Sequence, residues 1–422
     1  MPEHRCEQPV AEPGPIDRTG TLAFVPARFG PGVVGGAEIV LRKIAEGLQA
    51  RGWDIEVLTT CAVDYFSWRN ELPAGSAVED GLLVRRFPAV QSTPGVERRA
   101  LGNRMLAGER LGLHDQQRWI NDDVRIPELF QWVLRHQGNY RAIVLGPYLF
   151  WPAYACSQIA GDRAVLWTCL HDEPYAYQEV FEPMLSGVTG LFLQTEPEHA
   201  LAHRIHPNLA PHALVGCGVE VPSSYDADGF RRRHGIDRPY LLYTGRREGA
   251  KGWDDLLAGF TRAVTRRDLP FALVTMGAGE VAPAAAVADR VIDVGFLPDH
   301  ERDSAYAGAA AYVQPSRYEA FSRTIMESWL AEVPVLGRAD SEVVRYHVER
   351  SGAGLLYRDV YEFEEALVFI ADAPEQGEIL GRAGRDYVLA SYQWPDVLGR
   401  IEAALCSWTS APEAAPAVAG AT

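Results

Sequence analysis

The sequence predicts an α/β protein of two similar domains, each a doubly wound arrangement of helices around a parallel sheet. With 422 residues and 47% hydrophobic content, the chain is longer than a single core usually extends. Short apolar runs alternate with helical or glycine-rich segments in both halves, which is typical of parallel sheets. A glycine-containing turn that ends at Pro222 separates the two series, so we expect the domain boundary there.

The apolar runs end at glycine, proline or polar residues, and we interpret them as strands. In the first half they cover residues 21–27, 54–60, 81–88, 142–148, 164–170, 190–195 and 212–218. In the second half they cover residues 240–244, 271–276, 291–294, 310–314, 334–337 and 354–357. The pattern beyond residue 362 is helical. Residues 91–132 are too long for a simple connection, so we expect extra helices there.

Composition and charge narrow the function. The net charge of −16 argues against general nucleic-acid binding, because contact with a phosphate backbone needs a basic face. No apolar run reaches the roughly 18 to 20 residues of a membrane span, and the N-terminal segment lacks a hydrophobic signal core, so we expect a cytoplasmic protein. The six cysteines show neither C-x-x-C spacing nor pairing with histidines, so we expect reduced thiols and no metal site.

Two glutamates mark the most informative stretch, residues 312–336. An apolar run ends at Pro315, and apolar residues then recur at helical spacing before Pro334. Glu319 therefore lies in the loop after a strand, and Glu327 lies in the following helix. A helix N-terminus offers unpaired N–H donors and a positive dipole end, which suit phosphate or sugar hydroxyls. Solvated acids beside a helix start would give the same pattern, so the pair alone does not identify a site.

A second segment upstream adds cations to the pattern. Gly245 and Arg246 follow an apolar strand, and Lys251 and Gly252 precede a helix. Only two of the 40 basic residues are lysines, Lys43 and Lys251. A lysine at this position in such an arginine-rich chain indicates that the site needs a compact ammonium rather than a planar guanidinium.

Together the two segments resemble the motifs of the retaining glycosyltransferases of family 4, which have the GT-B fold. That family carries a G-R-x-x-x-K-G segment followed by a Glu-x7-Glu segment. Residues 245–252 match the first, with the lysine displaced by about one residue, and residues 319–327 match the second. The resemblance covers most of residues 21–405. It implies two Rossmann-like domains that face a cleft, the first for the acceptor and the second for the nucleotide sugar.

The resemblance and the residues together predict a domain organisation. We expect a disordered tail over residues 1–19, an acceptor-binding domain over 20–221, a nucleotide-sugar-binding domain over 222–394, a terminal helix returning to the first domain over 395–410, and a disordered tail over 411–422. The boundary at Pro222 matches the family's Gly-Val-Asp turn, with Gly218 retained and the acid lengthened to Glu220.

Sugar transfer requires positive charge where the diphosphate leaves, and preorganised side chains can supply it. Arg246 and Lys251 are the expected clamp, and we expect no metal and no cofactor. Glu327 is expected to accept from the ribose hydroxyls, whereas Glu319 and the N–H groups of residues 320–322 hold the sugar. Arg246, Lys251, Glu319 and His171 form the predicted catalytic set.

His171 follows the apolar run 164–170 directly, at a strand's carboxyl end where α/β sheets bind ligands. The resemblance implies that it orients the sugar or the acceptor. The donor-binding residues that we predict are Gly35, Gly36, Gly245, Gly277, Phe296, Leu297, Ala320, Phe321, Ser322 and Glu327. For the acceptor, which would carry a free hydroxyl, the candidates are Arg98, Arg99, Trp119 and Asp172.

The expected reaction is the transfer of a hexose-type sugar from a nucleotide-diphosphate sugar, with UDP favoured over GDP or dTDP. Ala320 and Ser322 stand where the family usually has glycines, and Asp340-Ser341 stands where it has Gly-Gly, which indicates altered sugar selectivity. A sugar-nucleotide epimerase, a phosphorylase and a non-catalytic binding protein of the same fold are the alternatives. The sequence leaves open the acceptor, the linkage and the oligomeric state.

Overall fold

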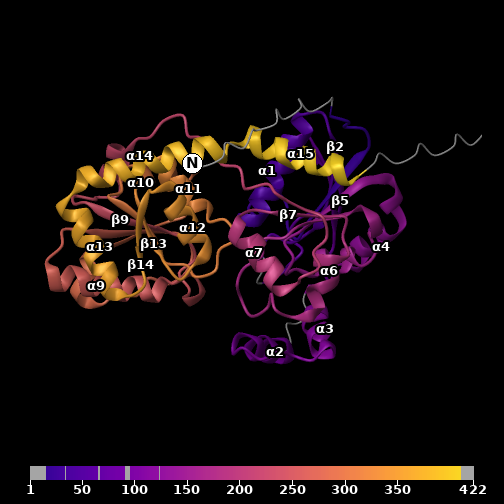
Figure 1. Cartoon of the computed structure of the whole chain (residues 1–422), viewed down its shortest axis with the longest axis horizontal. Helices are drawn as coiled ribbons and strands as arrows, with labels where there is room; N and C mark the ends of the chain where they lie inside the picture. The colour runs from indigo at the N-terminus through magenta and orange to yellow at the C-terminus, as the bar shows by residue number, and fades with distance from the viewer. Residues whose placement is uncertain (1–15, 34, 65–66, 91–95, 123, 410–422) are drawn as a thin grey trace, which may run out of the picture.

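The computed structural model describes residues 16–33, 35–64, 67–90, 96–122 and 124–409. They form two α/β units that lie side by side, each with its own sheet between helices (Figure 1). The first sheet has eight strands and the second has six. The two separate sheets confirm the predicted architecture. None of the helices in the described ranges is both long and apolar enough to cross a bilayer.

The first sheet has the strand order β3-β4-β2-β1-β5-β6-β7-β8. All neighbours are parallel except β3, which runs antiparallel to β4. The strands are β1 Thr21–Pro26, β2 Asp54–Thr60, β3 Gly75–Glu79, β4 Leu82–Phe87, β5 Tyr140–Gly146, β6 Ala164–Trp167, β7 Gly190–Leu193 and β8 His212–Leu214. The sequence missed β3 because this edge strand is mostly exposed and has no apolar run.

The second sheet has the order β11-β10-β9-β12-β13-β14 and is parallel throughout. Its strands are β9 Tyr240–Thr244, β10 Ala272–Met276, β11 Val291–Gly295, β12 Ala311–Gln314, β13 Val335–Arg338 and β14 Gly354–Tyr357. The strand order reverses direction between β9 and β12. Ligands of open α/β sheets bind at such switch points, beyond the carboxyl ends of the strands.

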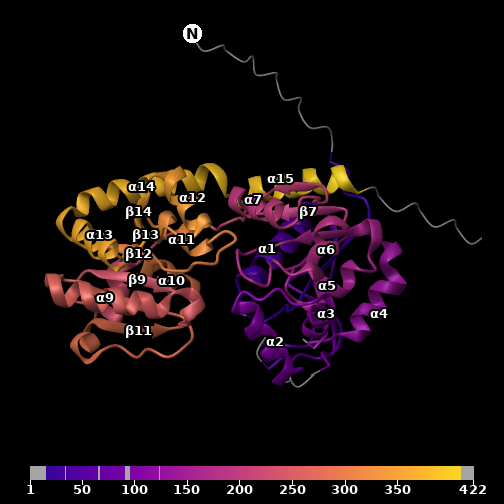
Figure 2. The same ribbon diagram turned by 60° about the horizontal axis from the view of Figure 1, so that its bottom comes forward.

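Helices cover both sheets (Figure 2). Those of the first unit are α1 Gly36–Ala50, α2 Val96–Leu106, α3 Leu113–Asn121, α4 Pro127–His136, α5 Trp151–Ser157, α6 Glu182–Ser186 and α7 Glu196–Ile205. Those that follow are α8 Ala227–Arg233, α9 Trp253–Arg267, α10 Asp299–Ala307, α11 Arg323–Leu330, α12 Glu342–Ser351, α13 Val360–Asp372, α14 Pro374–Ser391 and α15 Trp394–Trp408. The predicted extra helices after β4 are α2, α3 and α4, while residues 91–95 and 123 lie outside the described ranges.

The chain crosses between the units twice, and the two crossings touch each other. The N–H of Val219 donates to the carbonyl of Tyr392 at 3.0 Å. A Cβ on Gly218 would lie 2.2 Å from the ring of Trp394, so only glycine fits beneath that indole. After the second crossing, α15 packs against α1, β7 and β8 of the first unit (Figure 1).

The predicted N-terminal tail was too long, because residues 16–19 contact the first unit. Asp17 pairs with the buried Arg141 at 3.0 Å. Arg18 donates to Glu402 of α15 at 2.8 Å, and this fully buried carboxylate also accepts from Arg51 at 2.6 Å and from the Trp53 indole at 2.9 Å. Residues 1–15 and 410–422 lie outside the described ranges.

Glu402→Ala should destabilise the protein strongly. Removing one partner of a buried charge network leaves the other charges uncompensated and costs about 3–5 kcal/mol. Denaturant unfolding of the whole chain measures this, and Glu375→Ala on the exposed face of α14 serves as a control with an expected change within about 0.5 kcal/mol. Equal midpoints for both variants would contradict the importance that we assign to the network.

Candidate functional site

The two sequence motifs meet at the carboxyl ends of β9 and β12. Lys251 ends a short 3₁₀ turn after β9, and Glu319 lies in the loop after β12. The Lys251 ammonium lies 2.9 Å from the Glu319 carboxylate, with side chains 30% and 13% exposed. Burial raises the pKa of Glu319, but Lys251 and His171 outweigh it, and the net direction is downward. Glu319 is therefore an anion paired with a cation.

His171 contributes to this centre from the other unit. It follows β6 and lies close enough to interact electrostatically with Lys251 and Glu319. Burial and the Lys251 ammonium lower the pKa of His171 to about 4, although Glu319 acts in the opposite direction. The imidazole is therefore neutral at pH 7, and a neutral imidazole can both donate and accept a hydrogen bond.

A cavity of about 120 Å³ lies between the two units beside Glu319. Leu170, Asp172 and Glu198 line it from the first unit. From the second unit, its lining includes Arg317, Glu319, Asp340 and Ser341. The Asp340-Ser341 pair therefore adds polar side chains to the lining of this cavity.

Three helices point uncapped N-termini at the carboxyl edges of the sheets. The residues at the N-cap positions of α1, α9 and α11 are Gly35, Gly252 and Ser322, and none of their side chains accepts a hydrogen bond from the helix. A Cβ on Gly36 would meet nothing within 4 Å, whereas one on Gly35 would meet the carboxylate of Glu38, which pairs with Arg28. Uncapped N–H groups and the helix dipole make such ends suitable for anions.

Two contacts fix the conformation of the loop before α11. Ser322 has a left-handed backbone with φ 64°, and its hydroxyl accepts from Gln314 at 2.6 Å, so it does not cap the helix. Thr195, at the start of α7 in the first unit, donates to the carbonyl of Ala320 at 3.0 Å. The amide N–H groups of Ala320 and Phe321 donate to no acceptor among the described residues. They are thus oriented but available to a ligand.

The two adjacent arginines after β9 differ in role. Arg247 is buried and donates to Thr275 at 3.1 Å and to the Gly279 carbonyl at 2.8 Å, and it also pairs with Asp293. It fastens the turn after β9 to strand β10, to the turn after β10 and to strand β11. Arg246 is 44% exposed and lies 3.0 Å from Glu248.

The predicted nucleotide end of the site lies at β10, β11 and α11. Gly277 has φ 127°, and a Cβ there would lie 2.3 Å from the Gly245 carbonyl, so the turns after β9 and β10 touch. Phe296 is 67% exposed after β11, and its neighbour Leu297 packs on the core. Glu327 accepts from the Tyr306 hydroxyl at 3.0 Å, which fixes one carboxylate oxygen.

Several predicted site residues have structural contacts instead. Phe321 is 3% exposed, so only its backbone reaches the site. Trp119 is 4% exposed and stacks on Tyr175 with ring centroids 5.1 Å apart, so it packs α3 onto the unit and presents no open face to an acceptor. The Arg98 guanidinium lies over that indole, at 5.2 Å from the ring centroid.

The other two acceptor candidates are exposed. Arg99 is exposed on α2. Asp172 lines the cavity and also accepts from Tyr177 at 2.6 Å and from Arg204 at 2.7 Å. Of the acceptor residues predicted from the sequence, only Asp172 therefore lies beside Glu319.

The sequence analysis missed Tyr148 and Glu173. The Tyr148 hydroxyl donates to Glu173 at 3.1 Å, and Glu173 lies 3.7 Å from the His171 ring. Burial raises the pKa of Glu173, against the influence of Tyr148 and Lys251. The sequence could have pointed to Tyr148, because this residue also follows a strand, β5, and so lies at the same edge of the sheet as His171.

The fold and this cleft define a GT-B protein, and solved structures agree. The sucrose-phosphate synthase of Thermosynechococcus elongatus has a TM-score of 0.67 and 18% identity, over 90% of this chain and 97% of that one. The Anabaena protein HepE in complex with UDP-glucose has a TM-score of 0.67 and 16% identity, over 92% of this chain and 99% of that one.

Sequence comparison then identifies the second unit. Residues 238–372 match the family of glycosyl transferases group 1. The 2-deoxystreptamine N-acetyl-D-glucosaminyltransferase of Streptomyces fradiae is 31% identical over 124 residues, which are 27% of this chain and 30% of that protein. The matched segments span 30% of the length of the curated relatives. Residues 238–372 are thus similar to the group 1 glycosyltransferase domain.

Gly252→Ala should disrupt the turn that carries Lys251. Gly252 has φ 73°, and a Cβ there would lie 2.3 Å from the Pro315 carbonyl. Gly235, with φ 64° and open space around it, is the matched control. Gly235→Ala should cost about 1–2 kcal/mol for the left-handed backbone, and Gly252→Ala about 1–3 kcal/mol more for the forced backbone shift. Denaturant midpoints measure both, and similar losses would refute the close contact.

Proposed function

We propose that the protein is a metal-independent retaining glycosyltransferase of family 4. It would transfer a hexose-type sugar from a nucleotide-diphosphate sugar to an acceptor hydroxyl. The observation that supports this most is the Lys251–Glu319 pair beside the uncapped N-termini of α9 and α11, with neutral His171 opposite. The site combines a cation, free N–H donors, a carboxylate and an imidazole at one switch point.

The cations and helix ends suit the leaving group. As the bond from the anomeric carbon to the phosphate oxygen breaks, negative charge builds up on the diphosphate. Arg246, Lys251 and the start of α9 would stabilise that charge without reorganisation. Glu319 pairs with Lys251, so an arriving diphosphate would take over the ammonium and leave Glu319 to accept from sugar hydroxyls.

The first unit would supply the acceptor side. His171 is neutral and can accept from one hydroxyl while it donates to another. Glu173 lies beside the imidazole and accepts a hydrogen bond from Tyr148, so polar side chains support the ring of His171. In the family the acceptor hydroxyl attacks the anomeric carbon of the donor sugar on the face from which the diphosphate leaves, and a single cavity shared by the two units would suit this.

UDP is the favoured nucleotide because the structure of HepE holds UDP-glucose. The group 1 match favours a transferase over an epimerase, a phosphorylase or a binding protein. A thermal-shift panel of UDP, GDP and dTDP tests the donor, since a ligand that binds the folded state raises apparent stability. Release of free nucleotide in the presence of an acceptor then tests transfer. Stabilisation by none of the three nucleotides would overturn the proposal.

Lys251→Ala should lower turnover by on the order of 10² or more, because loss of one preorganised donor at a developing charge costs about 3 kcal/mol. Lys43→Ala is the matched control, since Lys43 is the other lysine of the chain and pairs with Glu220 on the surface at 2.8 Å. Arg246→Ala should behave like Lys251→Ala. Turnover of a folded Lys251→Ala protein within about threefold of the control would refute the clamp.

Glu319 and Glu327 should have separable roles. Glu327→Gln should weaken the binding of free nucleotide and of intact nucleotide sugar to the same extent, as expected for a contact with the ribose. Glu319→Gln should leave nucleotide affinity nearly intact, because Lys251 keeps its charge, while turnover falls, as for a contact strengthened in the transition state. Calorimetry with nucleotide and with nucleotide sugar, together with rates, separates the two. Equal loss of nucleotide affinity would show that the placement of Glu319 is wrong.

Turnover should survive chelation, because side chains and helix ends supply the positive charge at the leaving group. Steady-state rates before and after dialysis against EDTA measure this. Complete loss of activity that Mg²⁺ or Mn²⁺ restores would contradict metal independence.

A further inference from the structure

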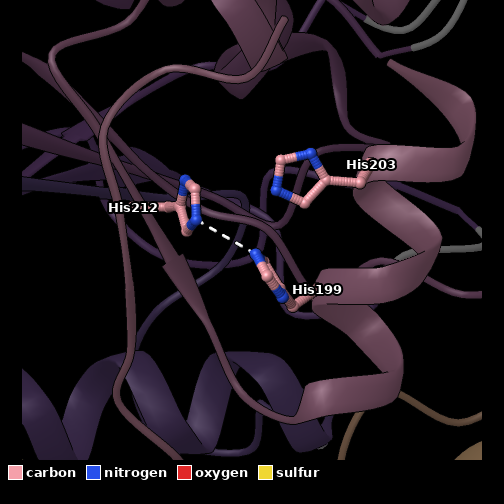
Figure 3. A group of neighbouring side chains, drawn as sticks. All are labelled: His199, His203 and His212. Carbon is pink, nitrogen blue, oxygen red and sulfur yellow. Dashed lines mark hydrogen bonds between the residues drawn. The ribbon is translucent and has the colours of Figure 1, made fainter. Parts of the chain in front are cut away.

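Three histidines converge on the surface of the first unit, between α7 and β8 (Figure 3). His199 and His203 are four residues apart on α7, so they share one face of the helix. His212 is the first residue of β8. One ring nitrogen of each lies within 4.8 Å of the others, and His199 Nε2 and His212 Nε2 are 3.0 Å apart.

The backbone fixes which nitrogen of His212 faces the cluster. His212 Nδ1 lies 3.1 Å from the carbonyl oxygen of Ala210, which can only accept, so Nδ1 carries the proton. In the neutral ring, Nε2 then has a lone pair directed at His199. On the far side of His199, Nδ1 lies 3.9 Å from a Glu196 carboxylate oxygen. Metal-binding histidines are oriented as His212 is, with the outer nitrogen held by a carbonyl or carboxylate.

The spacing fits a tetrahedral metal. With Zn–N bonds of 2.0–2.1 Å, two ligand nitrogens of a tetrahedral site lie about 3.3 Å apart, close to the distance between the two Nε2 atoms. His203 is exposed and can rotate to supply the third nitrogen.

We propose that His199, His203 and His212 bind a divalent transition-metal ion, with Zn²⁺ as the best fit, and that this ion fastens α7 to β8. Imidazole ligands suit Zn²⁺ and related ions, and three histidines leave a fourth position for water. This revises the expectation of no metal site, which overlooked the i, i+4 spacing on α7.

The position of the cluster suggests a structural role. Helix α7 starts at Thr195, which bonds to Ala320, and Arg204 near its end lies 3.8 Å from Glu342 of α12. The helix therefore carries contacts between the two units. An ion held by α7 and β8 would fix the helix that makes these contacts, at a place separate from Lys251 and Glu319.

Zinc titration of the full-length chain, stripped with EDTA, tests the proposal. Calorimetry should give one Zn²⁺ per chain, and Zn²⁺ should raise the melting temperature. His199→Gln, His203→Gln and His212→Gln should each weaken binding at least about tenfold, since even changes behind metal ligands cost 10–100-fold. His114→Gln, on the exposed surface of α3, is the matched control and should bind as the parent chain does. Affinity should also fall from pH 7.5 to pH 5.5, because protons compete for the imidazoles.

Melting of each metal-free variant checks that it folds. Absence of Zn²⁺ binding to the parent chain would overturn the proposal, as would equal binding to all four variants. Undiminished binding to His203→Gln alone would overturn the three-ligand site. Loss of binding in His114→Gln to the same extent would place the ion elsewhere and so reject the cluster.

Discussion

The ion pair between Lys251 and Glu319 is the contact on which the site depends. It joins the loops after β9 and β12, which belong to motifs 68 residues apart. Both side chains are largely withdrawn from water, where an unpaired charge is costly. The pair therefore keeps the two loops in register when no ligand is bound, and the same two charges are those that a nucleotide sugar would engage. The Lys251–Glu319 pair thus both supports the two loops and supplies charges for the proposed reaction.

The sheets supply the setting for this pair. Because neighbouring strands are parallel, their carboxyl ends share one edge, and the strand order reverses between β9 and β12. The helices that follow these strands begin at that edge with uncapped N-termini. His171, after β6, occupies the corresponding edge of the other sheet. Two edges of this kind facing each other yield a cleft with cations on one wall and a neutral imidazole on the other.

Much of this organisation could be read from the sequence, because apolar runs and glycine turns are local signals. Contacts between distant segments could not. The sequence pointed to Arg246 through its place after Gly245, but it gave no sign that the adjacent Arg247 is buried and donates to Thr275 of β10 and to the Gly279 carbonyl. Trp119 was predicted to bind the acceptor, but it is buried and stacks on Tyr175. His212 meets His199 and His203 only because β8 lies beside α7.

The two chain crossings have a mechanical consequence. They lie against each other, tied by the Val219–Tyr392 hydrogen bond and by the fit of Gly218 under Trp394. Across the cleft the units touch through polar contacts such as Thr195 with Ala320, each worth about 0.5–1.5 kcal/mol. The chain crossings thus form a joint along one side of the molecule, and polar contacts bridge the cleft on the other side. A rotation about that joint would widen the cleft while both sheets stay intact.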